Sequence, residues 1–238
     1  MNLENVISEG WQKITHLYRG REIFWYRSPQ ILLLRRSLQK IIPKYAKGIV
    51  LDAGAGQSDY KDMFSRCRKY IAIDLGPKEN LSCVANVINL PFKEQRFDTV
   101  FCSQVLEHLP NPSLALNEFY KALKPGGNLI LTVPHLSCYH DLPHDYYRFT
   151  IEGISFLLSQ AGFKTITAVG NASILSFIGH ILSHIVLGLS GGCRIVNRII
   201  FLINSLVSYV IAFIDYFLLG FAKNIPLNII AICVKTGS

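Results

Sequence analysis

Short apolar runs alternate with segments of helical spacing along residues 48–170 of this 238-residue chain. The strand-like runs span 48–54, 70–74, 97–103, 128–133 and 163–169, and helices are predicted over about 58–68, 113–123 and 151–161. Strands that are separated by helices pair in parallel, and both faces of their sheet need helical cover. The alternation therefore predicts an α/β fold with a mostly parallel sheet.

A glycine-rich loop, LDAGAG over residues 51–56, follows the first predicted strand. Glycines there allow the backbone to approach a ligand closely, and a helix that starts after the loop favours negative groups. The loop does not match the dinucleotide fingerprint GxGxxG, because Asp59 stands at the place of the last glycine. Asp74 ends the second predicted strand, where an acid can accept hydrogen bonds from both hydroxyls of a ribose.

Three further segments follow in order: NVINLPF (86–92), FDTVFCSQVLEHL (97–109) and LKPGGNLILTVP (123–134). With these segments, residues 48–170 resemble the class I S-adenosylmethionine-dependent methyltransferases. The resemblance implies a Rossmann-like seven-stranded sheet with helices on both faces, whose antiparallel seventh strand lies between strands five and six. It also implies S-adenosyl-L-methionine as cofactor and methyl transfer by in-line displacement.

The resemblance assigns roles to particular positions. The positions that match the family's cofactor-binding residues are Asp52, Gly54, Gly56, Asp74, Asn86 and Gln104. The first three would line the methionine part of the cofactor, and Asp74 would hold its ribose. Asn86 replaces the usual Asp near the adenine, and its amide can still bond the exocyclic amine. Gln104 would lie beside cofactor and acceptor, and Ser58 replaces a glycine common in the loop.

A polar cluster follows the fifth predicted strand, between His135 and Thr150. It lies where ligands bind in parallel sheets, so we expect His140 or His144 to act as a base, since imidazole titrates near neutral pH. Asp141 or Asp145 would orient the ring, and Arg148 would hold an anionic group of the acceptor or pin the loop. The alternative is a purely structural network of these side chains.

No metal is predicted at this cluster, because Pro143 argues against the helix that paired ligands four residues apart would need. The cluster also resembles an HDxPHDYYRxT segment found in a subset of these methyltransferases, several of them linked to surface glycan or lipid modification. That resemblance implies a small-molecule, glycan or lipid-linked acceptor.

Residues 171–225 interrupt the α/β pattern. Residues 171–222 carry only Arg194, Arg198 and Asp215 as charges, within two apolar runs, 174–189 and 199–222. Each run has a polar stripe at helical spacing: Ser173, Ser176, His180 and His184 on the first, and Asn204, Ser208, Ala212 and Asp215 on the second. We expect a hydrophobic helical hairpin between strands six and seven that docks on the cytoplasmic leaflet. A membrane-spanning hairpin and a dry dimer interface are the alternatives.

Three parts result: a basic helical N-terminal arm over 1–47, a methyltransferase domain over 48–170 and 226–238, and the hydrophobic insertion over 171–225. The arm holds nine Lys/Arg against three Asp/Glu and should end at Pro43 and Gly48. Six scattered cysteines without a CxxC motif favour a reducing cytoplasm. The sequence thus predicts a cytoplasmic, peripherally membrane-associated enzyme.

Two other functions stay open. One is an inactive cofactor-binding scaffold recruited to a membrane as an interaction partner. The other is a nucleic-acid methyltransferase, which the basic arm would suit. Residues 103–106 (SQVL) stand where such enzymes carry Asn/Asp-Pro-Pro-aromatic, so no nucleic acid is expected as partner. A homodimer is also left open.

Overall fold

The computed structural model describes residues 3–18, 22–138, 140, 143–190, 194–218 and 226–237. The chain divides into two compact units. The sheet unit comprises Leu38–His135, Asp141–Val169 and Ile229–Ser238. The hairpin unit comprises Met1–Ser37, Leu136–His140 and Gly170–Asn228. The N-terminal arm and the insertion were expected as separate parts, but residues 1–37 and the insertion share one unit.

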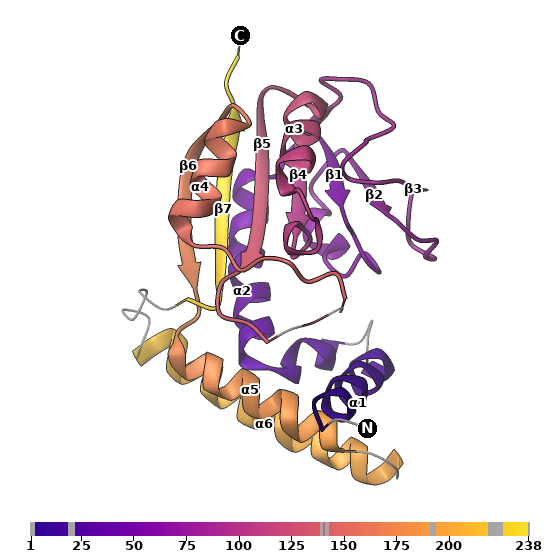
Figure 1. Cartoon of the computed structure of the whole chain (residues 1–238), viewed down its shortest axis with the longest axis vertical. Coiled ribbons are helices and arrows are strands. Elements are labelled where there is room, and N and C mark those ends of the chain that lie inside the picture. Colours follow the sequence, from indigo (N-terminus) through magenta and orange to yellow (C-terminus); the bar gives the residue numbers. More distant parts are fainter. Residues whose placement is uncertain are drawn as a thin grey trace. The chain divides into compact units, whose positions relative to one another are not determined.

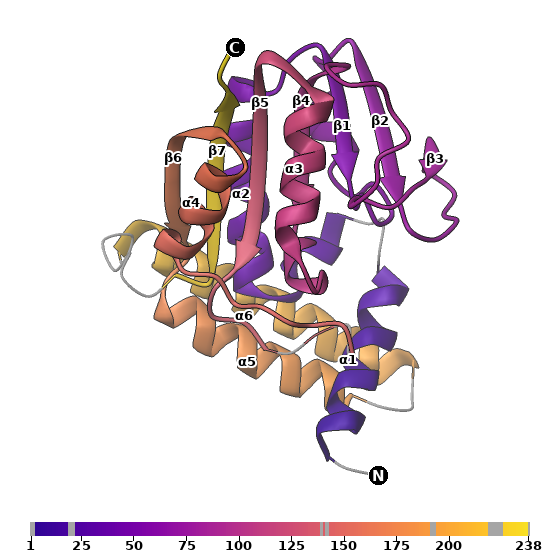
Figure 2. The same cartoon turned by 45° about the horizontal axis from the view of Figure 1, so that its top comes forward.

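The sheet unit is built on seven strands in the order β3-β2-β1-β4-β5-β7-β6 (Figure 1). Their bounds are β1 Ile49–Ala53, β2 Lys69–Asp74, β3 Cys83–Val84, β4 Phe97–Ser103, β5 Leu123–Pro134, β6 Phe163–Asn171 and β7 Asn228–Lys235. Strands β1 to β5 pair in parallel, whereas β7 runs opposite to β5 (Figure 2). The predicted fold class is confirmed, including the seventh strand between β5 and β6.

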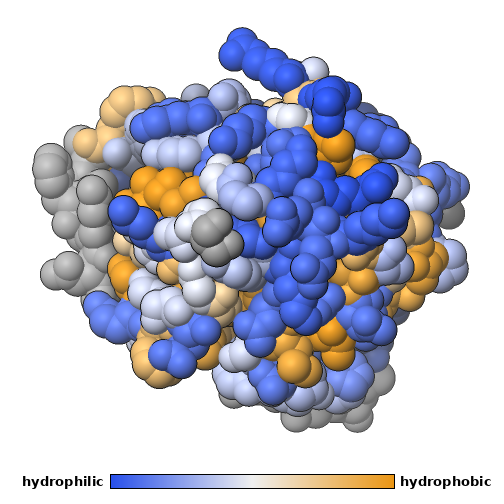
Figure 3. Space-filling view, turned by 90° about the horizontal axis from the view of Figure 1, so that it is seen from above, coloured by the Kyte–Doolittle hydropathy of each residue, from blue (hydrophilic) through white to orange (hydrophobic). Residues whose placement is uncertain are grey.

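Two helices of the sheet unit, α3 (Pro112–Ala122) and α4 (Ile151–Gln160), begin where the sequence supplies caps. Asn111 accepts from the backbone N–H of Ser113 (3.2 Å), and Thr150 accepts from that of Gly153 (2.9 Å). Such caps satisfy N–H groups that a helix cannot pair internally. Both helices share one apolar core with the strands. The outer face drawn in Figure 3 carries mainly hydrophilic side chains between small apolar areas.

The helix expected over about 58–68 is wrong. That segment forms turns and a short 3₁₀ helix, η2 (Lys61–Phe64). Ser58 adopts a left-handed backbone with φ of 61°, which an α-helix cannot contain. Phe64 then anchors the segment on Phe101, with ring centroids 5.3 Å apart. Tertiary packing and one turn residue therefore override the local helical signal.

Other boundaries shift by a few residues. Helix α2 (Pro29–Tyr45) continues past Pro43, because in the last turn the missing N–H costs a single hydrogen bond. Strand β5 begins at Leu123 and includes the predicted turn over 124–127, with a register irregularity against β4. Strand β3 has two residues and was not predicted, since so short a run carries no period.

The hairpin unit contains α1 (Leu3–Tyr18), η1 (Glu22–Arg27), α5 (Ile174–Leu189) and α6 (Arg194–Leu218). Helices α5 and α6 lie side by side (Figures 1 and 2), as expected for the insertion. Helix α6 starts five residues before the predicted run, and the predicted end at 222 lies outside the described residues. Helix α1 packs on α5 at Gly10 and Gly188, where a side chain on either glycine would collide with backbone of the other helix.

Lys235 on β7 carries a testable prediction. It is buried, and its Nζ donates to the carbonyl oxygens of Tyr120 (2.8 Å) and Leu123 (2.9 Å) at the end of α3. Methionine keeps the unbranched shape of the lysine stem but cannot donate, so Lys235→Met should lower the free energy of unfolding by about 3 kcal/mol in denaturant titrations. Lys121→Met, which removes an exposed pair with Glu118, is the control and should shift the midpoint far less. Equal shifts would contradict this role.

Candidate active site

Parallel pairing brings the ends of four strands to one edge of the sheet. Asp52 on β1 lies in register with Ala72 on β2 and Phe101 on β4. Ser103, at the end of β4, lies in register with Thr132 near the end of β5. The glycine loop, Asp74, Gln104 and His135 directly follow or end these strands, so the sheet collects them at its carboxyl edge.

The loop after β1 is a series of left-handed residues. Gly54, Gly56 and Ser58 have φ of 79°, 59° and 61°. A side chain at Gly54 would also collide with Val105, which follows β4. Ser58 therefore keeps the left-handed turn at the position where a glycine is common, and it carries the strain of a left-handed non-glycine residue.

Asp52 is a buried acid with an unusual pKa. Burial raises its pKa to about 7, and the neighbouring carboxyl groups of Asp74 and Asp59 add to this, against a hydrogen bond from the Tyr70 hydroxyl. A buried carboxyl of this kind is stabilised in its charged form by a nearby cation. Tyr70, which positions the carboxyl, was not singled out from the sequence.

Asp74 differs from Asp52 in its surroundings. Its carboxylate accepts from the backbone N–H groups of Gly56 and Leu75 (2.8 Å each) and pairs with Lys78 (2.9 Å). Partial burial raises the pKa of Asp74, but the hydrogen bonds from Lys78 and Gly56 outweigh it, so the pKa lies below its usual value. The site thus holds one acid at its rim whose pKa is lowered and one in its interior whose pKa is raised to about 7.

The side chain of Asn86 forms a hydrogen bond within its own loop. Its Oδ1 accepts from the backbone N–H of Ile88 (3.1 Å), which leaves the amide NH₂ available to a ligand. Leu75 and Ile88 follow the two polar residues closely and expose apolar side chains. They could pack on the faces of a flat heterocycle held by Asp74 and Asn86. Their place one and two residues after those polar residues is the signal that could have found them.

Gln104 is held by Thr132. Its backbone is left-handed, with φ of 56°, and its N–H donates to the carbonyl of Thr132 (3.0 Å). Its side-chain Nε2 donates to Thr132 Oγ1 (3.1 Å), which also bonds Ser103 Oγ (2.8 Å). The amide of Gln104 is thereby oriented by a fully buried hydroxyl. Only the register of β5 against β4 reveals Thr132, so the sequence alone gave no signal for it.

The described part of the polar loop, residues 143–150, is attached to the segment after β4. Three hydrogen bonds join them: Tyr146 N–H to Glu107 O (2.8 Å), His108 Nδ1 with His144 O (2.6 Å) and the Tyr147 hydroxyl to Pro110 O (2.8 Å). At the loop's end His135 Nδ1 bonds Phe149 O (2.6 Å). The loop is therefore fixed mainly through its backbone, with one further bond from the side chain of Tyr147.

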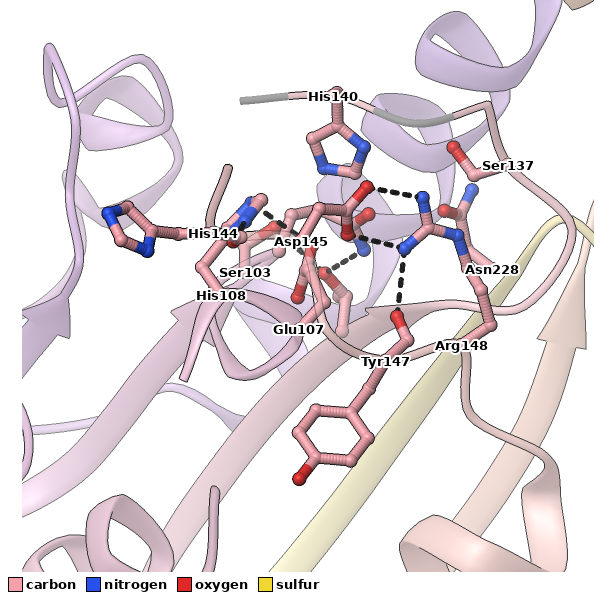
Figure 4. A network of polar contacts seen from close by, with 12 residues as sticks. Ser103, Glu107, His108, Ser137, His140, His144, Asp145, Tyr147, Arg148 and Asn228 are labelled. Carbon is pink, nitrogen blue, oxygen red and sulfur yellow. Dashed lines mark hydrogen bonds and ion pairs between the residues drawn. The ribbon is translucent and has the colours of Figure 1, made fainter. Parts of the chain in front are cut away.

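Asp145 and Arg148 form a two-pronged ion pair within this loop (Figure 4). The nitrogen–oxygen distances are 2.6 and 2.7 Å, and the carboxylate of Asp145 is fully buried. A guanidinium offers two parallel donors that match both oxygens of a carboxylate. The expectation that Asp145 orients the ring of His140 or His144 stays a prediction. Of its two expected roles, Arg148 makes the contacts that would pin the loop. Asp141 lies outside the described residues.

The two candidate bases differ in their settings. His144 belongs to the sheet unit, is exposed, and places Nδ1 3.1 Å from the hydroxyl of Tyr146. His140 belongs to the hairpin unit, where its Nδ1 lies 3.2 Å from the carbonyl of Cys138. The backbone carbonyl of His144 is tied to the segment after β4 through His108, and both histidines stay candidates for the base.

Comparison with known proteins adds the family. Residues 51–131 match the family model described as a methyltransferase domain. Over 89 residues the chain is 33% identical to a tRNA U34 carboxymethyltransferase of Campylobacter curvus (strain 525.92), covering 33% of this chain and 30% of that protein. It is 31% identical over 97 residues to a ubiquinone/menaquinone biosynthesis C-methyltransferase of Psychromonas ingrahamii, covering 40% and 39%. A SAM-dependent methyltransferase structure from Archaeoglobus fulgidus has a TM-score of 0.56 at 16% identity, over 86% of this chain and 94% of that one.

This chain contains a class I S-adenosylmethionine-dependent methyltransferase domain. The match covers about a third of the length of the curated relatives. The family-model match includes the glycine loop, Asp74 and Gln104, the positions expected on the cofactor side of the domain. The likeness to the Archaeoglobus structure concerns the fold alone.

The residues of the methyltransferase domain fit S-adenosylmethionine. That molecule carries an ammonium group and a sulfonium, which supplies the methyl group, and either charge would stabilise the carboxylate of buried Asp52. Asp74 would accept from the ribose hydroxyls, and Asn86, Leu75 and Ile88 would hold the adenine. Lys78 already pairs with Asp74, so ribose would share that carboxylate with it.

Asp52→Asn tests the electrostatics of this site. The folded chain holds the Asp52 proton up to about pH 7, whereas an unfolded chain releases it at about pH 3.9. The free energy of unfolding therefore decreases as the pH rises from about 3.9 to about 7. Asparagine removes that loss. In denaturant titrations at about pH 8 we expect Asp52→Asn to be the more stable protein, by about 1.4 kcal/mol for each pKa unit recovered. Calorimetry should show cofactor affinity at least about tenfold weaker.

The exposed acid Asp62 on η2 supplies the control. Asp62→Asn should follow the parent protein in stability and cofactor affinity. If Asp52→Asn were less stable than the parent at high pH, burial of the carboxyl would not be the source of its raised pKa.

Thr132→Val tests the positioning of Gln104. Valine keeps the shape but removes the hydroxyl that bonds Nε2, so turnover should fall about tenfold while cofactor affinity stays near that of the parent protein. Thr99→Val is the matched control, because Thr99 is equally buried and bonds Lys47, away from the carboxyl edge. Both variants should lose some stability, and an equal loss of turnover would reject the positioning role.

Proposed function

We propose that this chain transfers the methyl group of S-adenosylmethionine to a small-molecule, glycan or lipid-linked acceptor near a membrane. The cofactor side of the site supports the reaction. One observation carries the acceptor class: α5 and α6 expose apolar side chains along their length, among them Leu182, Leu206 and Phe217. An enzyme with such a surface works where apolar surface is covered, and a membrane offers acceptors of these classes.

The reaction asks little of the protein beyond position and one proton. In-line displacement requires the acceptor atom to face the sulfonium methyl, and an acceptor hydroxyl must lose its proton. His144 suits that task because its ring is exposed while its backbone carbonyl is held by His108. Gln104, fixed by Thr132, would orient the acceptor or the cofactor beside it.

Two alternatives compete with this proposal. A relative's name includes tRNA, so the exclusion of nucleic acid as acceptor stays a prediction. The absence of an Asn/Asp-Pro-Pro-aromatic segment at residues 103–106 argues against base methylation. An inactive scaffold would be expected to lose Asp74 or the glycine loop, and both are present with compatible geometry.

Methyl-labelled S-adenosylmethionine offers the direct test. The purified chain is incubated with membrane extract or total RNA from its source cells, and label is expected in the lipid or glycan fraction of the membrane extract. Label in RNA would establish the nucleic-acid alternative. Cofactor binding by calorimetry without transfer to either extract would support the scaffold.

His144→Ala adds a prediction on the base. The loop contact uses the carbonyl of residue 144, which alanine keeps, so cofactor affinity should not change. Methyl transfer should fall about 10²-fold or more. Tyr146→Phe is the control, because it removes the hydroxyl that contacts the ring but keeps the imidazole. Full activity of His144→Ala would remove His144 as the base, and full activity of His140→Ala as well would assign the loop a structural role.

A further inference from the structure

Helices α5 and α6 bury their polar residues. The buried polar side chains include Ser176, His180 and Ser183 on α5 and Asn204, Ser208 and Asp215 on α6. Asp215 Oδ2 accepts from the backbone N–H groups of Ser173 and Ser176 (3.1 Å each), which caps the start of α5. Polar contacts therefore hold the inside of the hairpin together. A helix pair surrounded by water has the opposite arrangement, with its apolar residues inside and its polar residues outside.

Partners within the hairpin unit satisfy other members of the buried polar faces. His180 Nδ1 lies 3.0 Å from Ser28 Oγ, and Asn204 Nδ2 donates to the carbonyl of Arg27 (2.8 Å). Ser183 and Ser208 bond each other across the two helices (3.3 Å). The polar faces are thus packed on η1 and the start of α2, and they are not available to a partner.

The opposite faces are apolar and exposed. We call them the apolar face, and its most exposed members include Ile178, Leu182, Leu189, Ile203, Leu206 and Phe217, each at least half exposed. By length and composition alone, Ile195–Phe217 could cross a membrane. Contiguous apolar surface of this extent is rare on proteins that are surrounded by water, and it marks a contact with lipid or protein.

Charge favours lipid over a second protein chain. The hairpin unit carries nine Lys/Arg against four Asp/Glu, so it is basic. Arg198 is exposed beside Ile199 on α6, and Arg36 lies over the ring of Tyr209, 5.3 Å from its centroid. Basic residues beside an apolar helix face are attracted to anionic headgroups, and aromatic residues concentrate at the same boundary.

The lengths and contacts of the helices favour a hairpin that lies in the membrane plane rather than one that crosses the membrane. Helix α5 has 16 residues and spans about 24 Å, short of the roughly 30 Å of hydrocarbon. Helix α1 packs on the C-terminal half of α5 through Gly10 and Gly188. Trp11 of α1 also stacks on His184 of α5, with ring centroids 4.6 Å apart. The exposed ion pair of Glu9 and Lys13 on α1 needs water, so this part of α5 cannot enter hydrocarbon.

We propose that the apolar face lies in the headgroup–acyl boundary of one anionic leaflet, with α5 and α6 parallel to the membrane plane. The polar faces and α1 stay on the aqueous side. This inference deepens the proposed function, on which it rests for its biological sense, because docking would keep the enzyme where a lipid-linked acceptor is presented. Docking itself requires no methyl transfer.

Flotation of the full chain with vesicles tests the docking. The protein should float with phosphatidylcholine vesicles that contain phosphatidylglycerol and float several-fold less with phosphatidylcholine alone. Leu182→Glu/Leu206→Glu should reduce flotation at least about tenfold, since two charges would enter the boundary. Leu17→Glu is the matched control, because Leu17 is as exposed as Leu206 but lies on the charged side of α1 with Glu9 and Lys13.

Three outcomes would overturn the proposal. Floated protein that resists extraction by alkaline carbonate would indicate a spanning hairpin. A dimer in solution that does not float, and that Leu182→Glu/Leu206→Glu dissociates, would assign the apolar face to a second copy. Equal flotation of the double variant and the parent protein would remove the apolar face from binding. Calorimetry of S-adenosylmethionine binding on each variant separates these results from failure of the proposed methyl transfer, which would leave flotation intact.

Discussion

Parallel pairing of β1 with both β2 and β4 is the constraint on which the site depends. It places Asp52 in register with Ala72 and Phe101, so the chain leaves three neighbouring strands at one edge. The backbone of the loop then bonds back onto that edge, with the N–H groups of Gly54 and Ala55 donating to the carbonyl of Ile73. A residue inserted in any of these strands would reverse side-chain faces and scatter the acids.

The site concentrates features that oppose stability. Gln104 and Ser58 hold left-handed conformations without being glycine, and Asp52 is buried with a raised pKa. Such strain persists where surrounding structure over-determines it, and here Thr132 and the loop contacts do so. A bound cation would relieve the electrostatic part, which couples cofactor binding to the free energy of unfolding.

Local signals in the sequence were sufficient to place most strands and to bring the residues expected to bind the cofactor to one edge of the sheet. The strand-like runs over 97–103 and 228–235 located β4 and β7 to the residue, and the spacing of Asp52 and Asp74 predicted two acids at one edge. Contacts between residues far apart in the sequence could not be predicted, as with His108 Nδ1 and the carbonyl of residue 144. The helix expected near 58–68 was wrong for the same reason, because the position of Phe64 depends on its ring contact with Phe101 on β4.

The insertion closes on itself, which explains how the sheet can accommodate it. Its ends meet through the backbone N–H of Leu227 and the carbonyl of Asn171 (3.0 Å). Asn171 also donates to Ser37 Oγ (2.8 Å), and Gln30 to Asn228 Oδ1 (3.1 Å), both from α2. A hydrogen-bonded pair of ends is what a short hairpin would present at the same place, so β6 and β7 keep their positions whether the connection is short or long. The chain can therefore carry a large apolar surface between two strands without disturbing the register that builds the site.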